Sequence, residues 1–243
     1  VKENALTLLE DALRRKRSAC MLGTGAMTDP YIPLESELGY VRGALSLALR
    51  YGFGFTLQTK SDRVLRDIDL LQAINERTKC VVQMTLTTYD EALCRKLEPN
   101  VCTTSARFAA LQKLREAGIP TVVWLSPILP FINDTEENIL GILRYCAEAK
   151  VKGVICFGMG VTLREGNREY FFAQLDRLFP GMKEQYIRTF GLSYENTSPR
   201  HAELMRLYHA FCEEHGMMHD NAEIFTYLRT FTDKTDKTQL SLF

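Results

Sequence analysis

The stretch of residues 23–35, GTGAMTDPYIPLE, combines backbone freedom with polar side chains in a way that suits binding of a polar ligand. Gly23 and Gly25 can adopt backbone angles closed to other residues, so their amide groups can come close to a ligand. Pro30 and Pro33 oppose an early helix and hold the loop open. The motif is weak by itself, because a tight connection between a strand and a helix has the same pattern.

Other polar residues follow apolar runs of strand length, where ligands of parallel βα proteins collect. Lys60 follows the second run, and its ammonium can bind a carboxylate or phosphate, although a surface lysine at a helix start has the same pattern. Thr85 ends the third run, either as a hydroxyl donor or as an ordinary β-branched strand residue. Ser126 follows the fourth run. Arg107 is expected to be solvated in the first turn of its helix.

Alternating helix and strand patterns predict the elements that position these residues. Five apolar runs have strand length, and they lie at residues 19–22, 53–58, 80–86, 121–125 and 153–157. Amphipathic segments separate them, including one helical pattern from Leu34 to Leu49 and another at 139–146, for which Asp134 and Glu137 predict a capping box. Strands that are apolar on both faces and alternate with helices predict an α/β fold with a parallel barrel or part of one.

Composition narrows the class of protein. The chain of 243 residues has 30 basic and 30 acidic side chains, so no global field attracts nucleic acid, and any DNA contact must be local. No apolar run reaches membrane-spanning length and no signal peptide precedes the first helix, which predicts a cytoplasmic protein without membrane contact. The seven cysteines include no pair at CxxC spacing and are expected to be reduced core residues. Four late histidines do not predict a zinc site.

The chain is expected to divide into a main domain, residues 1–215, a helical segment, 216–231, and a polar tail, 232–243. It opens with Val1 inside a helical pattern, so we expect it to be a fragment.

Several segments together resemble a known family. In chain order they are GTGAMTDPYIPLE, TKS at 59–61, LEP before Arg107, AGIP at 117–120 and SPILP at 126–130. They resemble the radical S-adenosylmethionine (radical SAM) enzymes related to spore photoproduct lyase, often called DNA repair photolyase-like proteins. The resemblance runs from about Val1 to Asp134 and more weakly to Phe211.

The resemblance implies a fold, cofactors and a reaction. The fold would be a partial parallel (β/α)6 TIM-like barrel whose first strand is absent from this chain, with extra C-terminal helices. A 4Fe-4S cluster would cleave S-adenosylmethionine reductively, and the deoxyadenosyl radical would abstract a substrate hydrogen. The resemblance also implies the residues that bind the cofactor: Thr24, Gly25, Thr28 and Asp29 around the methionine moiety, Lys60 and Thr85 at the strand ends, and Ser126 near the adenine.

Two departures limit what the resemblance implies. The family's CxxxCxxC cluster loop is absent, so the cluster ligands are expected upstream of Val1, and this chain alone is expected to be inactive. Spore photoproduct lyase has a hydrogen-donating cysteine in the loop that matches residues 23–29. Here that position is Ala26, which cannot donate the atom, and Cys20 is expected to be buried in the first strand. The substrate and the hydrogen-atom donor therefore stay open.

The resemblance implies a lyase-like radical SAM enzyme, when full length, that acts on a DNA lesion or nucleotide. A peptide or small-metabolite substrate is an alternative, and so is a noncatalytic accessory protein of the sliding clamp. The last five residues resemble the pentapeptide with which bacterial DNA replication and repair proteins bind that clamp. Gln239 would form hydrogen bonds, and Leu240, Leu242 and Phe243 would fill an apolar cleft. Alternatively, the pentapeptide folds back onto the barrel.

Overall fold

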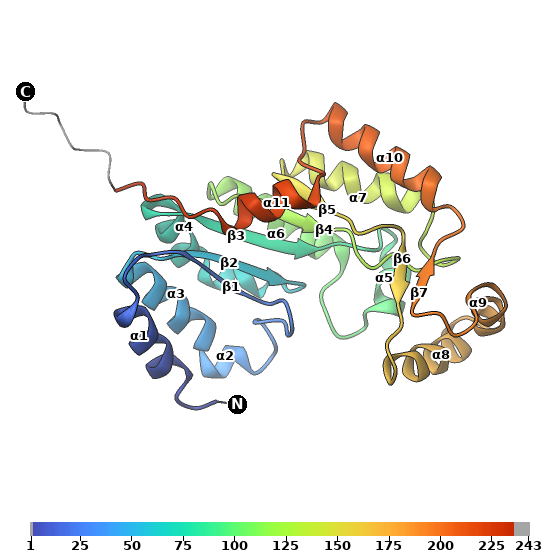
Figure 1. Ribbon diagram of the computed structural model, residues 1–243, viewed down its shortest axis with the longest axis horizontal. Helices are drawn as coiled ribbons and strands as arrows, with labels where there is room; N and C mark the ends of the chain where they lie inside the picture. Colours follow the sequence, from blue (N-terminus) through green and yellow to red (C-terminus); the bar gives the residue numbers. More distant parts are fainter. Residues whose placement is uncertain (1, 236–243) are drawn as a thin grey trace, which may run out of the picture.

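A computed structural model describes residues 2–235 of the chain, and its centre is a parallel sheet of five strands (Figure 1). The strands lie side by side in chain order: β1 (Met21–Thr24), β2 (Gly54–Thr59), β3 (Cys80–Thr85), β4 (Thr121–Trp124) and β5 (Gly153–Ile155). Each strand is within two residues of its predicted start. The predicted α/β fold with a parallel partial barrel is therefore confirmed.

Helices on one face of the sheet build the main core. They are α1 (Ala5–Arg15), α3 (Tyr40–Tyr51), α4 (Ile68–Arg77), α6 (Thr104–Glu116), α7 (Glu136–Glu148) and α10 (His201–Glu214). In β3, Cys80, Val82 and Met84 belong to this core, whereas the intervening Val81 belongs to a second, smaller cluster. This alternation is the period-2 pattern of a strand that is buried on both faces.

Among the described residues one helix, α11 (Asn221–Arg229), covers the second face and lies across the sheet (Figure 1). Its Ile224 and Leu228 pack against Val81, Val122 and Ile155 of three neighbouring strands. Because α11 covers only part of this face, polar residues nearer the carboxyl ends of the strands still line a cavity there.

The remaining elements complete the described chain. They are α2 (Glu35–Leu38), the 3-10 helix η1 (Asp62–Asp67), α5 (Glu91–Leu97), α8 (Asn167–Leu178), α9 (Met182–Phe190) and the antiparallel pair β6 (Gly160–Thr162) and β7 (Glu195–Thr197). None of the helices in residues 2–235 has the length and apolar character needed to cross a membrane.

Two helix boundaries differ from the prediction. The helical pattern from Leu34 to Leu49 is divided between α2 and α3, because Gly39 adopts a left-handed conformation with φ of 64°. Thr135, not Asp134, caps α7, since its side chain accepts a hydrogen bond from the Asn138 N–H at 3.2 Å. Asp134 is buried instead and accepts a hydrogen bond from the Ser198 hydroxyl.

Candidate active site

Asp29 fixes the loop after β1 to the carboxyl end of β2. One carboxylate oxygen accepts hydrogen bonds from the Tyr31 N–H at 2.9 Å and the Thr59 hydroxyl at 2.7 Å. The other accepts from the Lys60 N–H at 2.7 Å. The structure thus joins two segments predicted to form the site, residues 23–35 and 59–61, and it uses the Asp29 carboxylate to position the loop.

Gly25 is required by the close approach of two backbone segments. Its φ is 98°, and an added Cβ would lie 2.1 Å from the carbonyl oxygen of Gln58. A side chain at Gly23 would meet only the Thr56 methyl group, at 3.7 Å. Thr24 and Thr28 are exposed on the same loop. Gly25 therefore allows the loop to pack against β2, whereas the absence of a side chain at Gly23 leaves space beside β1.

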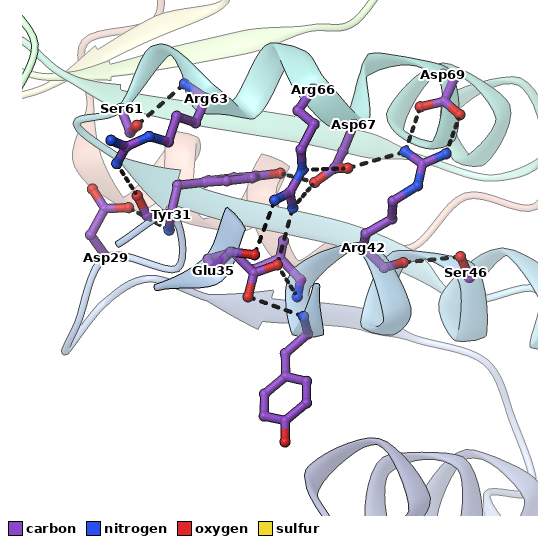
Figure 2. A network of polar contacts seen from close by, with 12 residues as sticks. Asp29, Tyr31, Glu35, Arg42, Ser46, Ser61, Arg63, Arg66, Asp67 and Asp69 are labelled. Carbon is purple, nitrogen blue, oxygen red and sulfur yellow. Dashed lines mark hydrogen bonds and ion pairs between the residues drawn. The ribbon is translucent and has the colours of Figure 1, made fainter. Parts of the chain in front are cut away.

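A buried network of charges holds the far end of this loop (Figure 2). The Tyr31 hydroxyl donates to Asp67 at 3.1 Å, and Asp67, which is fully buried, also accepts hydrogen bonds from Arg66 and Arg42. Burial, together with the Asp67 charge, raises the pKa of Tyr31, so its hydroxyl remains a donor. Tyr31 is a structural residue and does not face the barrel opening.

Glu35 completes the anchoring of the loop. Its carboxylate accepts hydrogen bonds from the N–H groups of Tyr40 at 3.0 Å and Val41 at 2.8 Å, at the start of α3, and from Arg66 at 3.0 Å (Figure 2). A carboxylate at a helix N-terminus satisfies free N–H groups and complements the helix dipole. The loop is therefore held rigidly at both ends.

Lys60, Glu98 and Arg107 form an ionic cluster near the strand ends. The Lys60 ammonium contacts one Glu98 carboxylate oxygen, and Arg107 Nη1 lies 2.9 Å from the other. Arg107 also donates to the carbonyl oxygen of Thr85 at 3.0 Å, while the Thr85 side chain is buried. Burial alone would raise the pKa of Glu98, but the two cations outweigh it and lower that pKa.

The expectation that Arg107 is solvated was wrong, because its side chain is fully buried. Four and seven residues later, Leu111 and Leu114 are also buried on α6. This spacing places Arg107 on the apolar face of the helix, where only a pairing carboxylate makes the charge tolerable. The spacing was visible in the sequence and could have identified Arg107 as a buried residue that needs an acidic partner.

A polar row crosses the second face of the sheet. The Gln83 amide donates to the Thr56 hydroxyl at 2.8 Å, and the Trp124 indole N–H donates to the Gln83 carbonyl at 2.8 Å. This row lines a cavity of about 660 Å³ together with residues of β1, the loop after it, β2 and α11: Gly23, Thr24, Ala26, Gln58, Phe225, Leu228 and Arg229. Of the predicted binding residues, this cavity includes only Thr24. Sequence reasoning missed Thr56 and Gln83, although polar residues inside otherwise apolar strands were a usable signal.

Ser126 lies in a second cavity, of about 540 Å³, at the ends of β4 and β5. Phe157, Asn196 and His201 also line it. Phe157 is 63% exposed, and the His201 Nδ1 accepts a hydrogen bond from the Met159 N–H at 3.2 Å. The predicted site residues therefore surround the strand ends without sharing one cavity.

The described cysteines do not fit an iron–sulfur cluster. All seven are free, and five of them are buried, as predicted. Cys20 differs from the expectation, since it precedes β1 and is half-buried. Burial raises the pKa of Cys80 and of Cys212 to about 12, which disfavours the thiolate that a cluster needs. Within residues 2–235, no three His, Cys, Asp or Glu side chains could together hold a metal ion.

Comparison with known proteins finds relatives but no matching family model. An uncharacterized protein of Mycobacterium tuberculosis is 30% identical over 189 residues, which are 76% of this chain and 54% of that protein. Another, from Methanocaldococcus jannaschii, is 30% identical over 136 residues, 56% of this chain and 49% of that protein. The chain thus spans about half the length of these curated relatives.

Solved structures share the fold at low sequence identity. A variant of spore photoproduct lyase matches 87% of this chain, and 63% of that chain, with a TM-score of 0.61 and 11% identity. Another variant of that enzyme, solved with bound AdoMet and dinucleoside spore photoproduct, matches 86% of this chain and 62% of that chain, with a TM-score of 0.59 and 12% identity. A domain of a pyruvate-formate lyase-activating enzyme from Bacteroides vulgatus matches 81% of this chain and 98% of that domain, with a TM-score of 0.52 and 11% identity. The fold of this chain is that of the radical SAM partial barrel.

Proposed function

We propose that this chain is the AdoMet-binding body of a radical SAM enzyme of the lyase type that acts on a DNA lesion or a nucleotide. The observation that carries the proposal is the fold, which matches that of a spore photoproduct lyase variant over 87% of the chain. The DNA-lesion substrate rests on this likeness and on the resemblance of the sequence motifs. When bound, AdoMet would supply the deoxyadenosyl group that abstracts hydrogen from the substrate.

The cavity on the second face of the sheet fits the adenosyl part of AdoMet. Its volume of about 660 Å³ lies in the range of small-molecule sites. Trp124 offers a flat aromatic surface whose indole is held in place by Gln83, and Gly23 leaves the cavity floor open at β1. Half-buried Gln58 and exposed Thr24 offer polar groups at its edge.

Lys60 would bind the AdoMet carboxylate only in competition with Glu98. Its ammonium already contacts Glu98, and its side chain is 36% exposed. A second carboxylate could approach from the exposed side, while Arg107 would keep Glu98 neutralised. The backbone of Lys60, held by Asp29, keeps the side chain close to the β1 loop.

Intrinsic fluorescence can test AdoMet binding, because Trp124 is the only tryptophan of the chain. We expect AdoMet to change its emission saturably, and Gln58→Leu to weaken the binding. Gln72→Leu makes the same chemical change on the exposed surface of α4 and should leave the affinity unchanged. Absence of AdoMet binding, or binding equally weakened by both variants, would contradict this use of the cavity.

The reaction needs a test in the full-length protein. Because the described cysteines do not fit a cluster, we propose that its thiolate ligands lie outside residues 2–235. After anaerobic reconstitution with iron and sulfide, we expect AdoMet-dependent formation of 5′-deoxyadenosine, increased by lesion-containing DNA. Turnover stimulated by peptides or small metabolites, and not by DNA, would overturn the substrate assignment.

A noncatalytic role at the sliding clamp is the second candidate, favoured by the lack of a cluster-like cysteine group in the described residues. Gln239, Leu240, Leu242 and Phe243, which we propose bind the clamp, lie outside the described residues. Deleting residues 239–243 should abolish binding to purified clamp. A reconstituted full-length protein that binds the clamp but forms no 5′-deoxyadenosine would favour the accessory role.

A further inference from the structure

A basic pocket lies at the opposite end of the sheet from the candidate active site. It occupies about 450 Å³ beside the amino ends of β3, β4 and β5. Lys79 precedes β3, Thr121 begins β4, and Lys152 precedes β5. The segment after α11 passes over these strand ends and contributes Lys234 (Figure 1).

The residues that line this pocket carry charge of one sign. Five are cations: Lys79, Arg115, Lys150, Lys152 and Lys234. Its lining includes no Asp or Glu among the residues that the structure describes. The chain as a whole is formally neutral, so the pocket is a strong local departure from its average charge.

Neutral backbone groups, instead of carboxylates, hold three of these cations. The Lys79 ammonium donates to the carbonyl oxygens of Tyr227 and Thr230, and it lies 3.8 Å from the centroid of the Tyr227 ring. Arg115 donates to the carbonyl oxygen of Glu148 at 2.8 Å, and Lys234 donates to that of Asn75. Within residues 2–235, none of the five cations forms a salt bridge. Their full charges are therefore left without ionic partners.

Helix dipoles explain part of this arrangement but not all of it. The carboxyl ends of α4, α6 and α7 lie near the pocket, and each helix end carries about half a negative charge. Three such ends offset roughly 1.5 of the five positive charges. Glu148 and Asp233 neighbour lining residues in sequence and keep their negative charges, since their carboxylates accept hydrogen bonds only from the neutral Gln112 and Thr235. Even these two charges and the helix ends together do not balance the five cations. A positive excess remains.

Lys79 shows the effect of this excess on one buried group. The residue is only 8% exposed. Burial, followed by the nearby Lys234 charge, lowers the pKa of its ammonium. An anion in the pocket would relieve both effects.

We infer that this pocket binds a phosphate group. Lysine ammonium groups are compact point charges that suit phosphate oxygens, and Lys150 and Lys152 are exposed and can both reach a ligand there. The phosphate could belong to a single-stranded nucleic acid passing over this end of the sheet or to a small phosphorylated molecule. The two sources share the same chemistry and are separated by the test below.

The test compares two charge-matched double variants of the 243-residue chain. Lys150→Gln with Lys152→Gln removes two pocket charges, whereas Lys16→Gln with Arg17→Gln removes two exposed charges beyond α1. Circular dichroism melting confirms that both variants fold. Binding of a single-stranded oligonucleotide is measured by fluorescence anisotropy across a range of salt concentrations, and binding of pyrophosphate by calorimetry.

If nucleic acid supplies the phosphate, the pocket variant should reduce the magnitude of the slope of log K against log salt by about 1.4, because each lost phosphate contact removes roughly 0.7. The control pair should keep the wild-type slope. If a small molecule supplies it, pyrophosphate should bind the wild type and the control pair but not the pocket variant. Equal weakening by both pairs, or binding of neither ligand, would overturn the proposal. Because this pocket and the cavity proposed for AdoMet share no lining residue, these outcomes are independent of the proposed reaction.

Discussion

Glu98 is the residue on which the charge balance near the strand ends depends. It is the carboxylate that faces both Lys60 and the fully buried Arg107. A buried guanidinium without a counter-charge keeps its desolvation cost and loses the compensating attraction.

Glu98→Gln should therefore destabilise the fold by about 3 kcal/mol, the lower end of the cost of breaking a buried ion pair. Urea unfolding of the variant and the wild type measures this difference. Asp176→Asn provides the control, since Asp176 pairs with Lys183 on the surface and its loss should cost less than about 1 kcal/mol. Similar effects of the two substitutions would contradict the importance of burial.

The lowered pKa of Glu98 also predicts a pH dependence. An acid whose pKa is lower in the folded than in the unfolded chain stabilises the fold fully above its unfolded value, 4.5, and loses this contribution as the pH falls through the folded value. The stability difference between wild type and Glu98→Gln should thus be constant from pH 7 to about pH 5.5 and shrink below that. Urea midpoints measured from pH 7 to pH 3 provide the check, and parallel curves would refute it.

At the scale of elements, the loop between β1 and α2 is held by backbone geometry as well as by hydrogen bonds. Gly25 begins this loop and Gly39 ends α2, which follows the loop, and both have positive φ. Only Gly25 is also packed against another backbone segment, because nothing lies within 4 Å of an added Cβ at Gly39.

Gly39→Ala should cost about 1 kcal/mol, the conformational penalty of a left-handed alanine. Gly25→Ala should cost clearly more, since the methyl group would collide with the Gln58 carbonyl. Thermal unfolding measures both, and the AdoMet titration shows whether the displaced loop alters the nearby cavity. Equal costs would show that the loop shifts freely away from β2.

The sequence predicts the elements better than it predicts their contacts. Apolar runs located all five strands, because burial on both faces leaves a continuous signal. The break at Gly39 and the Thr135 cap were missed, since each depends on which local hydrogen bond the folded chain selects. For the candidate site, the strand-end rule selected residues that the structure places around the carboxyl ends of the strands, and their role in binding stays a prediction. The rule could not show that the Asp29 carboxylate would bind the end of β2, or that Lys60 would contact Glu98. In each case the two partners lie far apart in the sequence.

For the whole molecule, burial predicts which cysteines react. Cys20 and Cys102 are half-buried, and the other five are buried. Brief treatment of the native chain with iodoacetamide should label only those two, with Cys102 slower because burial raises its pKa. Peptide mass spectrometry identifies the labelled sites, and treatment in denaturant should label all seven. Rapid labelling of Cys146 or Cys212 in the native chain would show that the core opens readily.

The order of the strands in the sheet is their order in the chain, so each new strand pairs with the one made just before it. A growing polypeptide can therefore extend this sheet progressively during synthesis, since its strand pairings are separated by short stretches of sequence. The face covered by α11 is the exception. Val81, Val122 and Ile155 stay exposed to water until α11 has been synthesised, so this face keeps apolar surface accessible after all five strands are made.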